Sequence, residues 1–160
     1  MAIFGKTSRA RLVTLCPELR RVAYDAIRVI DFSVIETERC EIAQNRYVDT
    51  GVSTVRWPNS KHNVCKGRLE PEAMDLWPYV PAFGALSGHP AQITDIAVES
   101  GRTPIEVRDF VYKAFARLAG VIEACGATYG HEVRWGGDWD GDGNLIDQDF
   151  HDLPHFELLR

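Results

Sequence analysis

The sequence lacks any long uninterrupted apolar run, because its apolar stretches extend over only a few residues. A helix that crosses a bilayer needs about 20 consecutive apolar residues, so membrane insertion is excluded. The N-terminal segment also lacks the apolar core of a signal peptide. We therefore expect the chain to be made and folded in a cytoplasm. Its 160 residues give room for one domain, which we place at residues 1–160.

Paired cysteines and an excess of basic residues are also missing. The four cysteines form no C-x-x-C pair, which predicts reduced, mostly buried thiols rather than a zinc site built from cysteine. Lysine and arginine number 18 against 23 acidic residues, and seven acidic residues lie within 138–157, where no Lys or Arg occurs. A nucleic-acid binder usually carries a basic face. The net charge of −5 therefore argues against a nucleic-acid partner.

Apolar periodicity predicts several helices. Apolar residues recur every three or four positions from Pro17 to Ile30, which indicates one face of a helix. Thr37 is expected to cap a second helix that ends near Val48. A third helix is expected to start at a capping box, where Thr103 precedes Pro104 and Glu106, and to end near Gly126.

Short β-prone runs separate these helices. They lie at 32–35, 73–76, 133–135 and 156–159, with polar or Pro- and Gly-rich connections at 52–70 and 78–90. Helices and strands do not alternate as they do in a doubly wound fold. The pattern predicts an α+β domain with a small, mostly antiparallel sheet flanked by helices.

Three short segments carry side chains that are able to bind a metal. They read Ser60-Lys61-His62, Ala73-Met74-Asp75 and Asp152-Leu153-Pro154-His155. A catalytic zinc site takes three protein ligands and leaves the fourth position to water. His62, Asp75 and His155 would supply such a set, with Asp152 beside them as general base. Spacing alone leaves the alternatives of surface or core histidines and of turn-capping aspartates.

In this order the segments resemble the S-x-H, A-x-D and D/E-x-x-H motifs of a zinc peptidase family, that of the D-Ala-D-Ala carboxypeptidases and phage L-alanyl-D-glutamate endopeptidases. Further stretches match the family: Glu38-Arg39 with Gln44-Asn45 and Gly51-Val52-Ser53, Trp135-Gly136-Gly137-Asp138-Trp139, and His155-Phe156-Glu157-Leu158. The resemblance spans residues 12–158 and implies the hedgehog/DD-peptidase fold.

The resemblance implies a function and a role for each matching residue. His62, Asp75 and His155 are expected to bind Zn2+, and Asp152 is expected to act as general base. Arg39 would hold a substrate carboxylate or steady the oxyanion, and Ser60 would hydrogen-bond the substrate or a ligand. The implied protein is a phage endolysin that cleaves the L-Ala–D-Glu bond of peptidoglycan stem peptides. It would be a monomer that leaves the host bacterial cytoplasm through holin-mediated release or lysis.

Two alternatives stay open, and one departure from the family bears on them. The chain could be a D,D- or L,D-carboxypeptidase acting on peptidoglycan peptides, or a wall-binding module that keeps zinc but has lost turnover. His62 and Asp75 are 13 residues apart, which is longer than in many relatives. The extra segment, residues 65–71, is expected to form a surface loop beside the cleft.

A second metal site is predicted in the acidic segment near the C-terminus. Asp138, Asp140, Asp142, Asn144 and Asp149 fall at positions 1, 3, 5, 7 and 12 of an EF-hand-type calcium loop, with Gly143 at position 6. The twelfth residue is Asp rather than the usual Glu, and no clear helix flanks the segment. A solvated turn without Ca2+ is therefore the alternative.

Overall fold

A single four-stranded sheet lies at the centre of the fold. The computed structural model describes residues 1–81, 97–98 and 100–160. The strands are β1 (Phe32–Glu36), β2 (Ala73–Pro78), β3 (Glu132–Trp135) and β4 (His155–Leu159). They pair antiparallel in the order β1-β2-β4-β3, so the central pair, β2 and β4, joins distant parts of the chain. This arrangement confirms the predicted α+β fold.

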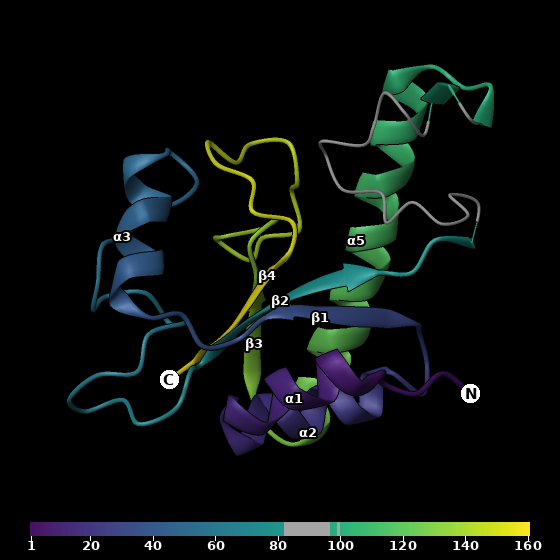
Figure 1. Cartoon of the computed structure of the whole chain (residues 1–160). Coiled ribbons are helices and arrows are strands. Elements are labelled where there is room, and N and C mark those ends of the chain that lie inside the picture. The colour runs from purple at the N-terminus through teal and green to yellow at the C-terminus, as the bar shows by residue number, and fades with distance from the viewer. Residues whose placement is uncertain (82–96, 99) are drawn as a thin grey trace.

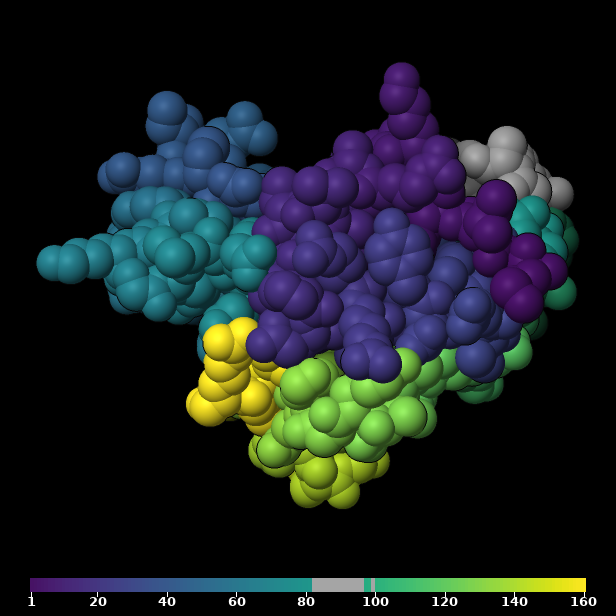
Figure 2. Space-filling model, turned by 90° about the horizontal axis from the view of Figure 1, so that it is seen from below, coloured from purple at the N-terminus to yellow at the C-terminus, as the bar shows by residue number. Residues whose placement is uncertain are grey.

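Helices surround the sheet: α1 (Lys6–Thr14), α2 (Pro17–Ala26), α3 (Glu41–Asp49) and α5 (Pro104–Thr128). Figure 1 shows α1 and α2 below the sheet, with α3 at the opposite side of the molecule from the long α5. The view from below shows that residues of α1 and α2 (purple) fill much of that face, while the C-terminal residues (yellow) lie next to the teal segment (Figure 2). Ion pairs of Arg160 with Glu18 and Glu72 hold the C-terminus against the rest of the protein.

The sheet has one apolar face and one polar face, because successive residues of a strand point to opposite sides. The apolar face and the helices form one continuous core. Its buried residues in the strands are Phe32, Val34, Met74, Leu76, Trp77, Val133, Trp135, Phe156 and Leu158, and those in α1, α2 and α5 include Leu12, Leu19, Val22, Val111, Phe115, Leu118 and Ile122. The opposite face carries the polar residues of the site.

The strand register brings these polar residues together. Asp75 lies directly opposite His155 on β4, and Arg134 of β3 lies opposite Glu157. The register of β1 against β2 shifts between Val34 and Glu36, which places Glu36 opposite Asp75. An extra residue of this kind redirects a side chain at the edge of a sheet. The charged groups of four strands therefore meet on one face.

The most strongly signalled helix matches its prediction. In α5, the side chain of Thr103 accepts a hydrogen bond from the backbone of Glu106, and the Glu106 carboxylate accepts one from the backbone of Thr103, as a capping box requires. The loop at 52–70 contains only an isolated bridge between Cys65 and Arg68. The predicted connection at 78–90 lies outside the described residues beyond Pro81. In the described part of the chain, no helix is long and apolar enough to span a membrane.

Three predictions about local structure were wrong. Thr37 does not cap α3, which begins at Glu41, because its hydroxyl is bonded to the backbone of Arg11 and the side chain of Thr14. Helix α2 ends at Ala26, short of the predicted Ile30, because the amides of Arg28 and Val29 bond three residues back in a tighter turn. All four cysteines are free, but only Cys16 is buried.

Candidate active site

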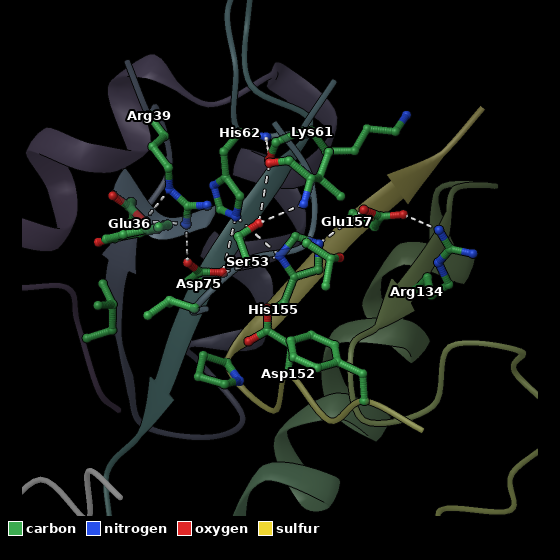
Figure 3. Close-up of a pocket in the computed structure, with 18 of the residues that line it drawn as sticks. Glu36, Arg39, Ser53, Lys61, His62, Asp75, Arg134, Asp152, His155 and Glu157 are labelled. Atoms are coloured by element: carbon green, nitrogen blue, oxygen red, sulfur yellow. Dashed lines mark hydrogen bonds and ion pairs between the residues drawn. The ribbon is translucent and has the colours of Figure 1, made fainter. Parts of the chain in front are cut away.

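A cavity of about 750 Å³ opens on the polar face of the sheet. Its walls come from all four strands, the end of α3 with the loop that follows, and the segment that precedes β4. Figure 3 shows His62, Asp75 and His155 pointing toward one another within this cavity, with Asp152 beside His155. The structure therefore brings the four residues predicted to form a zinc site into one place.

Three ligand atoms form a nearly equilateral triangle. The distances are 3.2 Å from His62 Nε2 to Asp75 Oδ1, 3.2 Å from His62 Nε2 to His155 Nδ1, and 3.3 Å from His155 Nδ1 to Asp75 Oδ1. In a tetrahedral zinc site with bonds of about 2.0–2.1 Å, ligand atoms lie about 3.3–3.4 Å apart. Two imidazole nitrogens and one carboxylate oxygen are also a ligand set that suits zinc. Both the donor chemistry and the spacing fit.

The second nitrogen of each histidine ring donates a hydrogen bond to the protein. This bond determines where the lone pair of the first nitrogen points. Nδ1 of His62 donates to the backbone carbonyl of Thr37 at 2.7 Å, because a carbonyl only accepts. Nε2 of His155 donates to Oε2 of Glu157 at 3.0 Å. In the neutral form of a histidine ring, which is the form that binds a metal, these hydrogen bonds keep the proton away from the triangle and direct the free lone pair into it. This arrangement of protons is the one that a metal ligand requires.

Charge coupling within this group is strong. Burial alone would raise the pKa of Asp75, but the two neighbouring histidines outweigh it and hold that pKa well below its usual range. Burial alone would lower the pKa of His155, yet hydrogen bonds to Asp75 and Glu157 raise it to about 9. Burial likewise opposes the shift at Glu157, where His155 and Arg134 lower the pKa to about 2. Asp75 and Glu157 are therefore ionised at neutral pH.

His62 comes from a loop that is anchored at several points. Its backbone carbonyl accepts from the amide of Arg39 at 2.9 Å, and its own amide donates to Oγ of Ser60 at 3.3 Å. The fully buried Asn63 donates to the carbonyl of Arg39 at 3.0 Å. Ser60 thus lies at the turn that presents His62, and it also lines the cavity.

Arg39 lies next to the ligands, but its guanidinium is already engaged with the protein. Nε donates to Glu36 at 2.9 Å, Nη2 donates to Glu36 and to Oδ2 of Asp75 (3.1 Å), and Nη1 donates to Gln44 at 3.1 Å. The group also stacks over the ring of Tyr47 and is only 8% exposed. In this geometry Arg39 holds the Asp75 carboxylate through Oδ2, while the other oxygen, Oδ1, faces the two histidines.

Asp152 occupies the segment that enters β4. Its amide donates to the carbonyl of Gly136 at 2.8 Å, and no described residue donates a hydrogen bond to its carboxylate. Burial raises the pKa of Asp152, and the nearby Asp75 raises it further. A carboxylate with a raised pKa that lines the cavity has the character of a general base.

Gly136 allows the close approach of this segment. A Cβ at Gly136 would collide with the backbone oxygen of Asp152 and would lie 3.1 Å from Cβ of His155. The Gly136 amide also donates to the carbonyl of His155 at 2.8 Å. The Trp-Gly-Gly stretch thus ends β3 directly against Asp152 and His155.

The acidic segment brings together part of the predicted calcium set. Carboxylate oxygens of Asp138, Asp140 and Asp142 lie within 4.8 Å of one another. The side-chain amide of Asn144 instead donates to Asp147 at 2.8 Å. Asp149 is exposed and does not belong to the three-carboxylate group.

The first part of the chain, residues 1–85, matches the model of the phage L-alanyl-D-glutamate peptidase family. The chain belongs to this family. The match includes Arg39, Ser60, His62 and Asp75, whereas Asp152 and His155 lie beyond it. A relative that extends over both parts is the L-alanyl-D-glutamate peptidase of Escherichia phage T5. It is 27% identical over 162 aligned residues, which cover 98% of this chain and 97% of the relative.

The fold is also found in a solved structure. The crystal structure of the Serratia marcescens L-Ala D-Glu endopeptidase ChiX matches with a TM-score of 0.66. The alignment covers 98% of this chain and 89% of ChiX, at 24% sequence identity. The phage L-alanyl-D-glutamate peptidase family member described here therefore shares its α+β architecture with ChiX.

The sequence did not reveal the supporting role of several residues that hold the predicted ligands in place. Glu36 pairs with Arg39, Gln44 is fully buried among Arg39, Ser53 and Val55, and Glu157 contacts His155. One signal was available in the sequence: Glu157 lies two residues after His155 in a strand, a spacing that places both on the same face.

Proposed function

We propose that this protein is a zinc-dependent peptidoglycan hydrolase that cleaves the L-Ala–D-Glu bond of stem peptides. The observation that carries the proposal is the triangle of His62, Asp75 and His155, whose lone pairs converge on one point inside a cavity. Membership of the phage L-alanyl-D-glutamate peptidase family supplies the bond that is cleaved.

His62, Asp75 and His155 would hold the ion. Bound zinc supplies a Lewis acid that polarises a carbonyl and lowers the pKa of water from 15.7 to about 7. The carboxylate of Asp152 accepts the proton of the attacking water and later passes it to the leaving amine. Arg39 keeps the Asp75 carboxylate oriented through Oδ2, and because it also lines the cavity we propose that it contacts a substrate oxygen. Ser60 supports the backbone turn at His62.

The charges of the cavity favour the endopeptidase over the carboxypeptidase alternative. A carboxypeptidase has to bind the free carboxylate at the end of its substrate. The described cations that line the cavity are already paired, Arg39 with Glu36, Lys61 with Glu72, and Arg134 with Glu157. An internal peptide bond makes no such demand for an unpaired cation.

Digestion of purified cell walls tests the proposal. The zinc-loaded protein is expected to solubilise the walls and a zinc chelator to stop it, while mass spectrometry of the muropeptides shows stem peptides freed from L-Ala. Release of a single terminal residue would instead identify a carboxypeptidase. Walls left intact by the zinc-loaded protein would identify a binding module.

Two substitutions separate the roles of the site residues. Asp152→Ala should keep zinc and lose about 100- to 10,000-fold in turnover, the usual contribution of a general base. His62→Ala should lose the metal as well, which metal analysis of the purified variant detects. Full activity of Asp152→Ala would exclude Asp152 as the base.

We also propose that the acidic segment binds Ca2+ through Asp138, Asp140 and Asp142, in support of the loop that ends just before Asp152. The grouping of three carboxylates supports this, since Ca2+ prefers oxygen ligands. Asn144 and Asp149 would have to move in order to join them. A rise in melting temperature on calcium titration is expected, and no rise at millimolar calcium would count against the site.

The wider setting follows from the same proposal. A single core that includes Phe4, Phe115 and Leu158 supports one catalytic domain over residues 1–160. We propose that this domain acts as a monomer on peptidoglycan. As a phage protein it would be made in the host bacterial cytoplasm and reach the wall after holin-mediated release or lysis.

A further inference from the structure

Glu157 lies behind a predicted ligand rather than in the ligand triangle itself. It follows His155 by two residues on β4, so both side chains project from the same face of the sheet. Its Oε2 accepts the proton of His155 Nε2 at 3.0 Å, on the side of the ring away from Nδ1. Glu157 is only 6% exposed. A buried carboxylate at this position fixes both the tautomer and the rotation of the ring.

Arg134 holds Glu157 in turn. It lies directly opposite Glu157 across the β3–β4 pair, and its Nη2 donates to the second carboxylate oxygen, Oε1. Within the described part of the chain, Nε of Arg134 is buried and makes no hydrogen bond. The guanidinium is therefore committed to Glu157 and to the Trp139 carbonyl, to which Nη1 donates at 3.4 Å.

Trp139 packs against the face of the His155 ring. Its indole lies against the His155 imidazole with centroids 5.5 Å apart and planes inclined by 32°. The guanidinium of Arg134 lies 5.3 Å from the centroid of the same indole. The edge of the His155 ring is thus fixed by Glu157 and its face by Trp139, and Arg134 contacts both of these residues.

We infer that Glu157 is a positioning residue for the metal ligand His155, held in place by Arg134 and Trp139. The inference rests on the proposed zinc site. An outer carboxylate that receives the second N–H of a ligating histidine orients the ring and makes it a better donor, and its loss typically weakens metal binding about 10- to 100-fold. Glu157 itself touches neither the ion nor the substrate in this role.

Zinc affinity, measured by competition with a chromophoric chelator, tests the inference on the full-length chain. Glu157→Gln keeps the shape but removes the charge, and Glu157→Asp keeps the charge but withdraws it from Nε2. Both variants should bind zinc about 10- to 100-fold more weakly than the unaltered protein. The visible spectrum of the cobalt-substituted protein should change as well, because the ligand geometry around the ion relaxes.

Glu72→Gln is the matched control. Glu72 is also a largely buried carboxylate in ion pairs, with Lys61, Arg68 and Arg160, and its side chain pairs with no predicted ligand. Its loss should lower the melting temperature of the metal-free protein and leave zinc affinity unchanged. If Glu157→Gln does not fold, Glu157→Asp decides.

The outcomes are distinct. Unchanged zinc affinity in the Glu157 variants would overturn the inference, and so would an equal loss in Glu72→Gln. Absence of zinc binding by the unaltered protein, with no difference from His62→Ala, would instead overturn the proposed function itself.

Discussion

The substitutions Gly136→Ala and Gly120→Ala each add one methyl group, the first in a crowded place and the second in open space. At Gly136 the new Cβ meets the backbone oxygen of Asp152 and lies 3.1 Å from Cβ of His155. Neither neighbour is the flexible end of a side chain, so the strand end and the 152–155 segment have to separate. At Gly120, inside α5, the new Cβ meets nothing within 4 Å. Both substitutions reduce the backbone freedom of the unfolded chain, but only Gly136→Ala disturbs a close contact. Comparing the two variants therefore separates these effects.

The magnitudes follow from these surroundings. Overpacking at Gly136 should lower the free energy of unfolding by about 1–3 kcal/mol, whereas replacing a helical glycine at Gly120 should raise it by about 0.5–1 kcal/mol. For a chain of this length, 1 kcal/mol corresponds to about 3 °C in melting temperature. The two variants should thus shift the melting temperature in opposite directions.

Activity adds a second readout. A misplacement of about 1 Å at a catalytic group costs about 100-fold in rate, so Gly136→Ala should lose wall-lysis activity at temperatures where it remains folded. Gly120→Ala should keep full activity. If Gly136→Ala melted and lysed walls like the unaltered protein, the close approach to Asp152 would be refuted. A less stable but fully active variant would refute only the claim that Gly136 sets the position of Asp152.

Three further predictions concern other parts of the molecule. Arg39→Met should lower the unfolding free energy of the metal-free protein by about 3–5 kcal/mol, because Glu36 and Asp75 lose their shared cation; urea denaturation measures this, and an unchanged midpoint would contradict it. Thr103→Ala should cost about 1 kcal/mol through loss of the α5 cap, seen as a melting temperature about 3 °C lower; an equal melting temperature would argue against it. Peptide mass mapping after alkylation at pH 8 should find Cys40 modified and Cys16 spared, since burial raises the pKa of Cys16 to about 11; rapid labelling of Cys16 would contradict its burial.

Local signals in the sequence determined how well each element was predicted. Helix α5 has both a capping box and a long apolar stripe, and its predicted start agrees with the structure. Helix α1 was not predicted because its sequence is mainly polar and only Ser8 and Leu12 are buried. The capping role of Thr37 was wrong because its hydroxyl bonds α1, a partner that no local pattern reveals.

The site could be predicted only through the motifs of the family. Asp75 and His155 are far apart in sequence and meet because β2 pairs with β4, whereas His62 is brought to them by a loop that is bonded to the backbone of Thr37 and Arg39. The strand order β1-β2-β4-β3 depends on packing between distant segments, which periodicity does not encode. The supporting pair of Arg134 with Glu157 depends on the strand register and was therefore out of reach, whereas Glu36 lies only three residues before Arg39, so that pairing is suggested by local spacing.

The long connection between His62 and Asp75 can be explained from the same geometry. Asp75 and His155 are fixed by the sheet, so only His62 depends on a loop. Arg68 donates to the backbone carbonyls of Ser60 and Asn63, on either side of His62. None of the residues 65–71 lines the cavity, although several are exposed as predicted.

The extra residues therefore fold back onto the loop that carries the ligand instead of entering the cleft. Because Arg68 braces this loop from outside, changes in the length of 65–71 should alter its rigidity before they alter the shape of the cleft. Differences in substrate preference are thus expected to arise from residues that line the cavity, such as Ile35, Val52 and Val55.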